Sequence, residues 1–254
     1  MPISNSIHGN LILIVSMAVG VAILSALGFW QVQRLAWKEN LIATVEARRT
    51  MEPVALEQVE GMFEEAPQSI EFRPVLVAGR FLHDSEQHYY VTREGQVGWH
   101  IFTPMLLEDG RVLFVNRGFA PERFKQQDQR KDGLVKGKQS FDGLARTAPD
   151  EKPNSFVPDN DLTENIYFWK SLDQMRQQLA AEYQDRVLPF FVDAGKGSNP
   201  GRWPEGGSTR ISFPNNHLQY AITWFGLALA LLGVGSYFLY ARLRRKAEAS
   251  GDNE

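Results

Sequence analysis

The sequence predicts a membrane protein of the α+β class. Two transmembrane helices, one N-terminal and one C-terminal, flank one extracytoplasmic domain that has a mainly antiparallel β-sheet and one or two helices. Two apolar blocks support this prediction, since residues 11–30 contain 16 hydrophobic side chains in 20 and residues 218–240 contain 17 in 23. A third observation is the Val-, Phe-, Tyr- and Thr-rich pattern between Phe72 and Pro121, which is typical of β-strands.

The first apolar block is long enough to span a bilayer. Between Pro2 and Gln33 there is no Asp, Glu, Lys or Arg, and a bilayer core needs about 20 apolar residues. A cleaved secretory signal peptide is the alternative, and the small residues at 25–28 would suit its cleavage site. The lack of basic residues before Leu11 and the length of the run favour a retained span, which we place at residues 11–31.

The second apolar block sets the orientation. No charged side chain occurs between Arg210 and Arg242, so we place the second span at residues 218–240. The positive-inside rule assigns the basic residues that follow it to the cytoplasm, and these are Arg242, Arg244, Arg245 and Lys246. Arg34 and Lys38, after the first span, favour the opposite orientation, but long loops are translocated largely regardless of charge. Both termini are therefore expected in the cytoplasm.

The spans divide the chain into five parts. In order, we expect a cytoplasmic N-terminus over residues 1–10, a first span over 11–31, a periplasmic domain over 32–210, a second span over 218–240 and a cytoplasmic basic tail over 241–254. The N-terminus contains no Arg and does not resemble a mitochondrial transit peptide. The expected location is therefore a bacterial cell inner membrane.

Composition excludes several functions. The chain has no Cys, so disulfides, thiolate metal sites, thiol nucleophiles and iron–sulfur clusters are ruled out. Its formal net charge of −3 argues against binding nucleic acid, which requires a concentrated basic face. A metal or cofactor would have to be held by His, Met, carboxylate or Tyr.

The pattern between the spans predicts the elements of the domain. After the first span the helical rhythm of Trp30, Arg34, Trp37 and Leu41 predicts that the helix continues out of the bilayer. Strands are predicted over 73–82, 87–92, 97–107, 111–117, 134–145 and 186–192. The sequence Glu108-Asp-Gly110 predicts a hairpin turn, because Asp-Gly tolerates positive φ angles.

The second half of the domain carries more polar segments. Residues 149–165 are expected to form a surface loop. The sequence Ser171-Leu-Asp-Gln174 is typical of a capping box, and the apolar spacing after it predicts a helix to about Gln184. The Gly- and Pro-rich segment 194–210 is expected to be a flexible linker into the second span.

Enzyme motifs are absent. Residues around Gly195-Lys196 lack the leading glycine and the Ser or Thr of a phosphate-binding loop, and there is no nucleophile elbow or His-Glu-x-x-His motif. We therefore expect a protein that is not an enzyme. His83 and His88, with two carboxylates between them, leave metal binding open, against the simpler interpretation of a polar hairpin connection.

His217 is the strongest candidate ligand. It stands at the start of the second span, after Asn215 and Asn216, which can cap a helix. Imidazole is a good axial ligand for haem iron, and Tyr220 and Trp224 offer an aromatic wall beside it. From these residues alone, a plain interfacial anchor is the favoured interpretation, and a haem ligand is the alternative.

Four segments resemble the surfeit locus protein 1 family of cytochrome c oxidase assembly factors. They are Leu27-Gly-Phe-Trp-Gln31 with Arg34, Phe72-Arg-Pro74, Val115-Asn-Arg-Gly-Phe119 and Asn215-Asn-His-Leu-Gln-Tyr-Ala221 with Trp224. The resemblance covers nearly the whole chain, in order and with the two-span layout. Phe119 departs from it, because many members carry Trp there.

The resemblance implies a role in maturing the catalytic subunit of a haem-copper terminal oxidase. Bacterial members are associated with binding haem a and presenting it for insertion, and the family's transmembrane histidine corresponds to His217. A site between the spans would use His217 as the axial iron ligand, Arg34 beside a haem propionate, and Tyr220 or Trp224 against the macrocycle. The implied partners are oxidase subunit I, the haem a synthesis machinery and membrane lipid.

Two other classes of function remain open at this point. One is a structural scaffold that stabilises oxidase subunit intermediates without holding haem. The other is an extracytoplasmic sensor, although only a short tail follows the second span.

Overall fold

The computed structural model describes residues 3–208 and 215–251. These residues form two compact units: the terminal segments up to Thr44 and from Ser212 onward make one, and Val45–Ile211 make the other. The helices are α1 (Ile3–Arg49), α2 (Leu56–Glu65), α3 (Leu172–Gln177), α4 (Ala181–Gln184) and α5 (His217–Gly251). The strands are β1 (Val54–Ala55), β2 (Pro74–Phe81), β3 (Gln87–Arg93), β4 (Gln96–Leu106), β5 (Val112–Pro121), β6 (Lys138–Thr147), β7 (Ile166–Tyr167) and β8 (Val187–Ala194).

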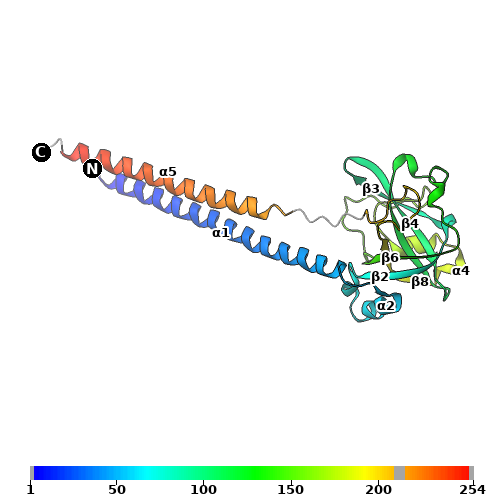
Figure 1. Ribbon diagram of the computed structural model, residues 1–254. Helices are drawn as coiled ribbons and strands as arrows, with labels where there is room; N and C mark the ends of the chain where they lie inside the picture. The colour runs from blue at the N-terminus through cyan, green and yellow to red at the C-terminus, as the bar shows by residue number, and fades with distance from the viewer. Residues whose placement is uncertain (1–2, 209–214, 252–254) are drawn as a thin grey trace. The chain divides into compact units, whose positions relative to one another are not determined.

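The terminal unit consists of the two long helices α1 and α5. Both are long and apolar enough to cross a membrane. The first runs unbroken from Ile3 to Arg49, which confirms the predicted continuation of the helix beyond the apolar block. Within this unit they lie side by side along much of their length (Figure 1).

The second unit is a closed β-sheet (Figure 1). The strand order is β1-β2-β6-β8-β5-β4-β3-β7, and a further pairing of β2 with β4 closes the five strands from β2 to β4 into a barrel. Most neighbours are antiparallel, as predicted, but β8 lies parallel to β5. The predicted class, two apolar terminal helices flanking a mainly β domain with a few short helices, is confirmed.

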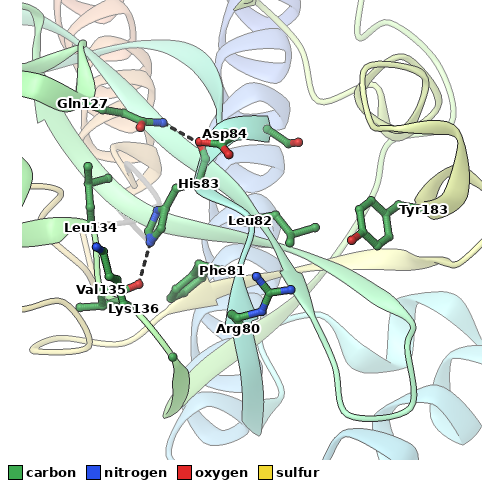
Figure 2. A pocket seen from close by; sticks show the side chains of 12 residues that line it. Arg80, Phe81, Leu82, His83, Asp84, Gln127, Leu134, Val135, Lys136 and Tyr183 are labelled. Carbon is green, nitrogen blue, oxygen red and sulfur yellow. Dashed lines mark hydrogen bonds between the residues drawn. The ribbon is translucent and has the colours of Figure 1, made fainter.

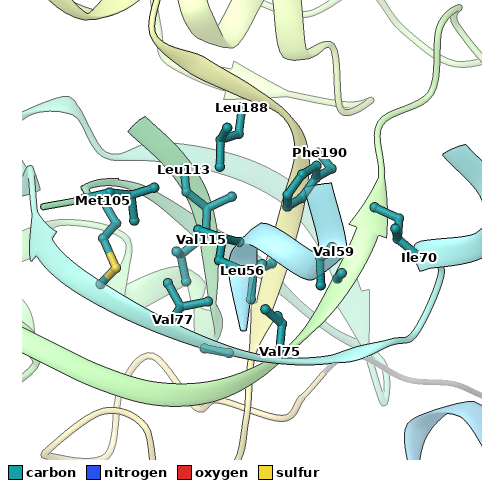
Figure 3. Close-up of a cluster of buried hydrophobic side chains, with 14 of the residues drawn as sticks. Leu56, Val59, Ile70, Val75, Val77, Met105, Leu113, Val115, Leu188 and Phe190 are labelled. Atoms are coloured by element: carbon teal, nitrogen blue, oxygen red, sulfur yellow. The ribbon is translucent and has the colours of Figure 1, made fainter. Parts of the chain in front are cut away.

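The buried hydrophobic side chains of the barrel domain form an inner cluster, an outer cluster and a smaller third cluster around Trp99. Strand β5 is buried on both faces, so Leu113 and Val115 point into the inner cluster while Val112 and Phe114 join the outer one. Figure 3 shows the inner cluster, in which Leu56 and Val59 of α2 pack with side chains of β2, β5 and β8. The outer cluster is packed against Met175 and Leu179.

Several predicted boundaries change in the structure. Residues 51–71 had no predicted element and contain α2, whose Leu56 and Val59 are spaced to bury one face. The predicted helix over 171–184 starts as expected, with the Ser171 hydroxyl accepting from the Gln174 amide, but it breaks into α3 and α4. The Gln184 side-chain amide donates to the carbonyl oxygen of Leu179 at 2.9 Å. This hydrogen bond gives a partner to a backbone carbonyl that loses its helical partner where the helix breaks.

Within its described part, residues 194–208, the predicted flexible linker is held by contacts with the barrel domain. Backbone hydrogen bonds join Glu205 to Phe119 of β5 in both directions, at 2.8 and 3.1 Å. The Trp203 ring stacks on Phe124 with 5.7 Å between ring centroids. Tertiary contacts of this kind cannot be predicted from the Gly and Pro content of the segment. Residues 209–214 of the linker lie outside the described residues.

Candidate functional site

The terminal unit places His217 against Gln31. His217 is the first residue of α5, and its Nδ1 lies 2.7 Å from Oε1 of Gln31 on α1. An amide oxygen can only accept, so the imidazole donates from Nδ1 and keeps a lone pair on Nε2. Within residues 3–208 and 215–251, no hydrogen bond engages Nε2. The imidazole therefore offers a free sp² nitrogen of the kind that ligates metals.

Close packing of the two helices brings these side chains together. A Cβ at Gly28 of α1 would lie only 2.7 Å from the Phe225 ring, and one at Gly20 only 2.8 Å from Leu231. On α5, Ala221 and Ala228 are buried and seven residues apart. Small residues at such spacing let two helix backbones approach closely. The Gln31 side chain, only 8% exposed, is one turn beyond Gly28.

The other predicted site residues lie near the same end of the helix pair. The Arg34 guanidinium is exposed and lies 4.1 Å from the centroid of the Trp37 ring. Tyr220 is 54% exposed and Trp224 is half-buried. Among the described residues, no hydrogen bond or ring contact joins Arg34, Tyr220 or Trp224 to His217.

Sequence reasoning missed the role of Gln31. Gln31 ends the segment Leu27-Gly-Phe-Trp-Gln31 but is not among the predicted site residues. A detectable signal existed, because Gln31 is a polar side chain at the end of an otherwise apolar run. A polar group on the packed face of a helix needs a hydrogen-bonding partner, and the partner here is His217.

The two histidines of the predicted hairpin connection are engaged separately. His83 donates from Nε2 to the carbonyl oxygen of Val135 at 2.8 Å, and Nε2 of His88 lies 3.0 Å from Oε1 of Glu86. In the described ranges there is no group of three or more His, Asp or Glu side chains placed to hold a metal ion. A polar connection is therefore the better interpretation of these residues, but it is not the predicted hairpin, because β2 and β3 do not pair with each other.

A cavity of about 570 Å³ adjoins His83 (Figure 2). Its wall includes Asp84 and Ser85 as well as His83, the side-chain types of a catalytic triad. The geometry of a triad is not present, because Nε2 of His83 is bonded to Val135 and its Nδ1 is buried without a partner. Nothing in this wall activates the Ser85 hydroxyl.

A buried charge network lies in the barrel wall around Asp193 of β8. Asp193 is 4% exposed, and its carboxylate accepts from Asn116 Nδ2 at 2.8 Å and from the Arg146 guanidinium at 2.7 Å. Arg146 also donates to Glu71 at 2.8 Å. Burial alone would raise the pKa of Asp193, but the charges of Lys170 and Arg146 outweigh it and lower that pKa. The carboxylate therefore stays ionised.

His100, beside this network, is held neutral. Asn116 Nδ2 lies 3.3 Å from its Nδ1, and burial lowers the pKa of His100 to about 4. Between that value and about 6.5 the unfolded chain binds a proton that the folded chain does not. Stability is therefore lost as the pH falls through this window.

We expect the neutral state of His100 to make the domain acid-sensitive. The contribution of His100 to the free energy of unfolding should fall by up to about 2 kcal/mol between pH 7 and pH 5. Thermal unfolding of the detergent-solubilised chain, measured at several pH values in this range, gives the dependence of stability on pH. His100→Asn should make that dependence weaker. His83, whose pKa burial also lowers, accounts for part of the remaining slope. Equal slopes in the variant and the wild type would contradict this assignment.

The Asn116-Arg-Gly-Phe119 motif holds the domain together. Arg117 is completely buried and donates to Asn199 Oδ1 at 2.7 Å and to the carbonyl oxygen of Gly133. Burial lowers the pKa of Arg117 to about 10, and its guanidinium lies 4.6 Å from the Phe81 ring centroid. The motif therefore ties β5 to the segment that leads to the second terminal helix.

Fold and site together define a class of protein. It is a closed β-barrel domain carried between two apolar terminal helices that could cross a membrane, with a ligand-type histidine held where the two helices pack. The SURF1 family model matches residues 18–229.

Individual relatives agree with this match. The chain is 36% identical over 221 residues to Surfeit locus protein 1 of Homo sapiens, covering 80% of this chain and 70% of that protein. It is 35% identical over 222 residues to Surfeit locus protein 1 of Xenopus tropicalis, covering 81% and 68%. It is also 36% identical over 233 residues to the SURF1-like protein of Monosiga brevicollis, covering 87% and 83%. The chain belongs to the SURF1 family, which confirms the resemblance that the four motifs indicated.

Proposed function

We propose that this protein is a membrane-anchored assembly factor for a haem-copper terminal oxidase, which binds haem a between its two spans and presents it for insertion into the catalytic subunit. Membership of the SURF1 family, a family of cytochrome c oxidase assembly factors, supports the oxidase role. The observation that carries the haem role is the free Nε2 of His217, held in place by Gln31. Among the described residues no catalytic constellation accompanies His217, and the role that we propose is that of an assembly factor and not of an enzyme.

The residues around His217 fit a haem. Haem iron supplies an open axial position, and an imidazole nitrogen with a free lone pair can occupy it. Arg34 is exposed and carries the planar, permanent charge that suits a propionate carboxylate. Tyr220 presents an exposed ring one turn from His217, and Trp224 lies on the same helix face two turns away.

The proposed location is a bacterial inner membrane, with both termini cytoplasmic and the barrel domain in the periplasm. The apolar lengths of α1 and α5 support membrane insertion. The basic residues Arg242, Arg244 and Arg245 near the end of α5 support a cytoplasmic C-terminus. Oxidase subunit I and the haem a synthesis machinery are the proposed partners.

Replacing His217 with Ala tests the haem role. Protein purified in detergent from cells that make haem a should show the Soret and reduced α bands of that haem. His217→Ala should lose most of this absorbance, because the variant lacks the axial nitrogen. The matched control is Gln219→Ala, an exposed position two residues further along α5. Equal haem content in His217→Ala and wild type would remove His217 from the site.

A scaffold without haem is the second candidate function. It is favoured by the structural role of the motif residues in the barrel, since Asn116 and Arg117 bind other parts of the domain. Co-purification of subunit I with a wild-type protein that carries no haem would support the scaffold over the haem carrier.

A further inference from the structure

We propose that Gln31 is the positioning residue for His217: its side-chain oxygen fixes the imidazole tautomer that leaves Nε2 free, and its neutral amide keeps that nitrogen a weak, releasable ligand. The inference rests on the proposed haem role for its purpose. The tautomer itself is a property of the protein without haem.

The position of Gln31 is fixed by packing. The residue follows Gly28 by one helical turn, where the Phe225 ring fills the space that a side chain would take. Phe29 also contacts Phe225 edge to face, with 5.3 Å between ring centroids. The backbone of α1 is therefore held close to α5 at this point. The buried Gln31 side chain has little room to leave His217.

The hydrogen bond decides which nitrogen is available. A neutral imidazole carries one proton, on either Nδ1 or Nε2. Oε1 of Gln31 lies 2.7 Å from Nδ1 and accepts a hydrogen bond from it, so the proton stays on Nδ1. Without this acceptor both tautomers are populated and the ring can rotate. A ligand histidine whose partner is removed typically binds its metal about 10- to 100-fold more weakly.

The neutrality of the amide sets the strength of the ligand. A carboxylate at the same place would form a charge-assisted hydrogen bond, roughly twice as strong as a neutral one. It would draw the Nδ1 proton toward itself and strengthen electron donation from Nε2 to iron. A protein that must pass its cargo on is better served by the weaker ligand. Gln31 therefore suits transfer, where Glu would suit permanent binding.

Three variants of the full chain in detergent separate these effects. Gln31→Leu removes the acceptor and keeps a side chain of similar volume. Gln31→Glu replaces it with a charged acceptor. Gln33→Leu makes the same change as the first at an exposed position two residues away, and serves as the matched control.

The first measurement is the ¹⁵N spectrum of histidine-labelled protein without haem. The chain has 5 His, and His217→Ala identifies the resonances of interest. The wild type and Gln33→Leu should show a protonated Nδ1 and an unprotonated Nε2 for His217. Gln31→Leu should show a mixture of tautomers. An unchanged spectrum in Gln31→Leu would overturn the proposal, whether or not the protein carries haem.

The second measurement is the release of purified haem a to excess apomyoglobin. Gln31→Leu should release it about 10- to 100-fold faster than wild type, Gln31→Glu more slowly, and Gln33→Leu at the wild-type rate. Release from Gln31→Glu as fast as from wild type would overturn the argument about ligand strength. Failure of the wild-type protein to bind haem a would instead refute the proposed function. The ¹⁵N spectra would still show whether Gln31 fixes the tautomer of His217.

Discussion

Replacing Asp193 with Asn is expected to lower the free energy of unfolding by about 3–5 kcal/mol, the range found when one partner of a buried ion pair is removed. Its carboxylate is 4% exposed and is the acceptor for Arg146 at 2.7 Å. The ammonium group of Lys170 lies 5.6 Å from the Tyr89 ring centroid. Burial lowers the pKa of Lys170, and the negative charge of Asp193 opposes part of that lowering. Without that anion, Lys170 loses the charge that compensates it, and Arg146 keeps only Glu71 as an anionic partner.

Thermal or urea unfolding of the detergent-solubilised chain measures this effect. Asp142→Asn is the matched control, because Asp142 is exposed in the same barrel and should change stability by less than about 0.5 kcal/mol. Adding Lys170→Met to Asp193→Asn should recover part of the loss, since it removes one uncompensated cation. A loss below 1 kcal/mol for Asp193→Asn would show that the network carries little of the domain's stability.

Replacing Gly118 with Ala is expected to cost about 3–5 kcal/mol, as the sum of backbone strain and a steric clash. Gly118 has a φ of +116°, which L-residues with a side chain rarely adopt. A Cβ built there would also overlap the backbone of Glu205. The same strand carries the backbone pairing of Phe119 with Glu205, so the variant should release the segment 199–205 from β5.

Gly137→Ala separates the two causes. Gly137 has a φ of +77° but nothing within 4 Å of the position of a Cβ, so this variant tests strain alone and should cost about 1 kcal/mol. Hydrogen exchange of the amides of Phe119 and Glu205 should rise in Gly118→Ala and stay unchanged in Gly137→Ala. Equal losses of stability in the two variants would contradict a role for the clash.

The strands were predictable because their signals are local. The predicted strand over 87–92 and the Glu108-Asp-Gly110 turn correspond closely to β3 and to the hairpin between β4 and β5, where Gly110 has a φ of +85°. The start of α3 was also predictable, because Ser171 caps it through a neighbour only three residues away. Each of these features depends on side chains that are close in sequence.

Features that depend on distant partners were not predictable in the same way. The segment 199–205 reads as a linker, and it is ordered because Asn199 binds Arg117, 82 residues away. Barrel closure depends on the pairing of Arg80 and Phe81 with Leu106 and Met105, which no periodicity within either strand reveals.

By itself, the sequence determined the class of protein. Two long uncharged apolar blocks need no partner to be recognised, and the alternating pattern between them requires a sheet with a buried face. His217 could likewise be singled out by its position at the start of an apolar helix.

Only the tertiary structure decided what His217 can do. Its hydrogen bond spans 186 residues of sequence to Gln31, and this bond determines which imidazole nitrogen is free. The physical reason is that both tautomers of an isolated histidine are available, and a choice between them requires an acceptor held at a fixed distance. That distance is set by the packing of Gly28 against Phe225.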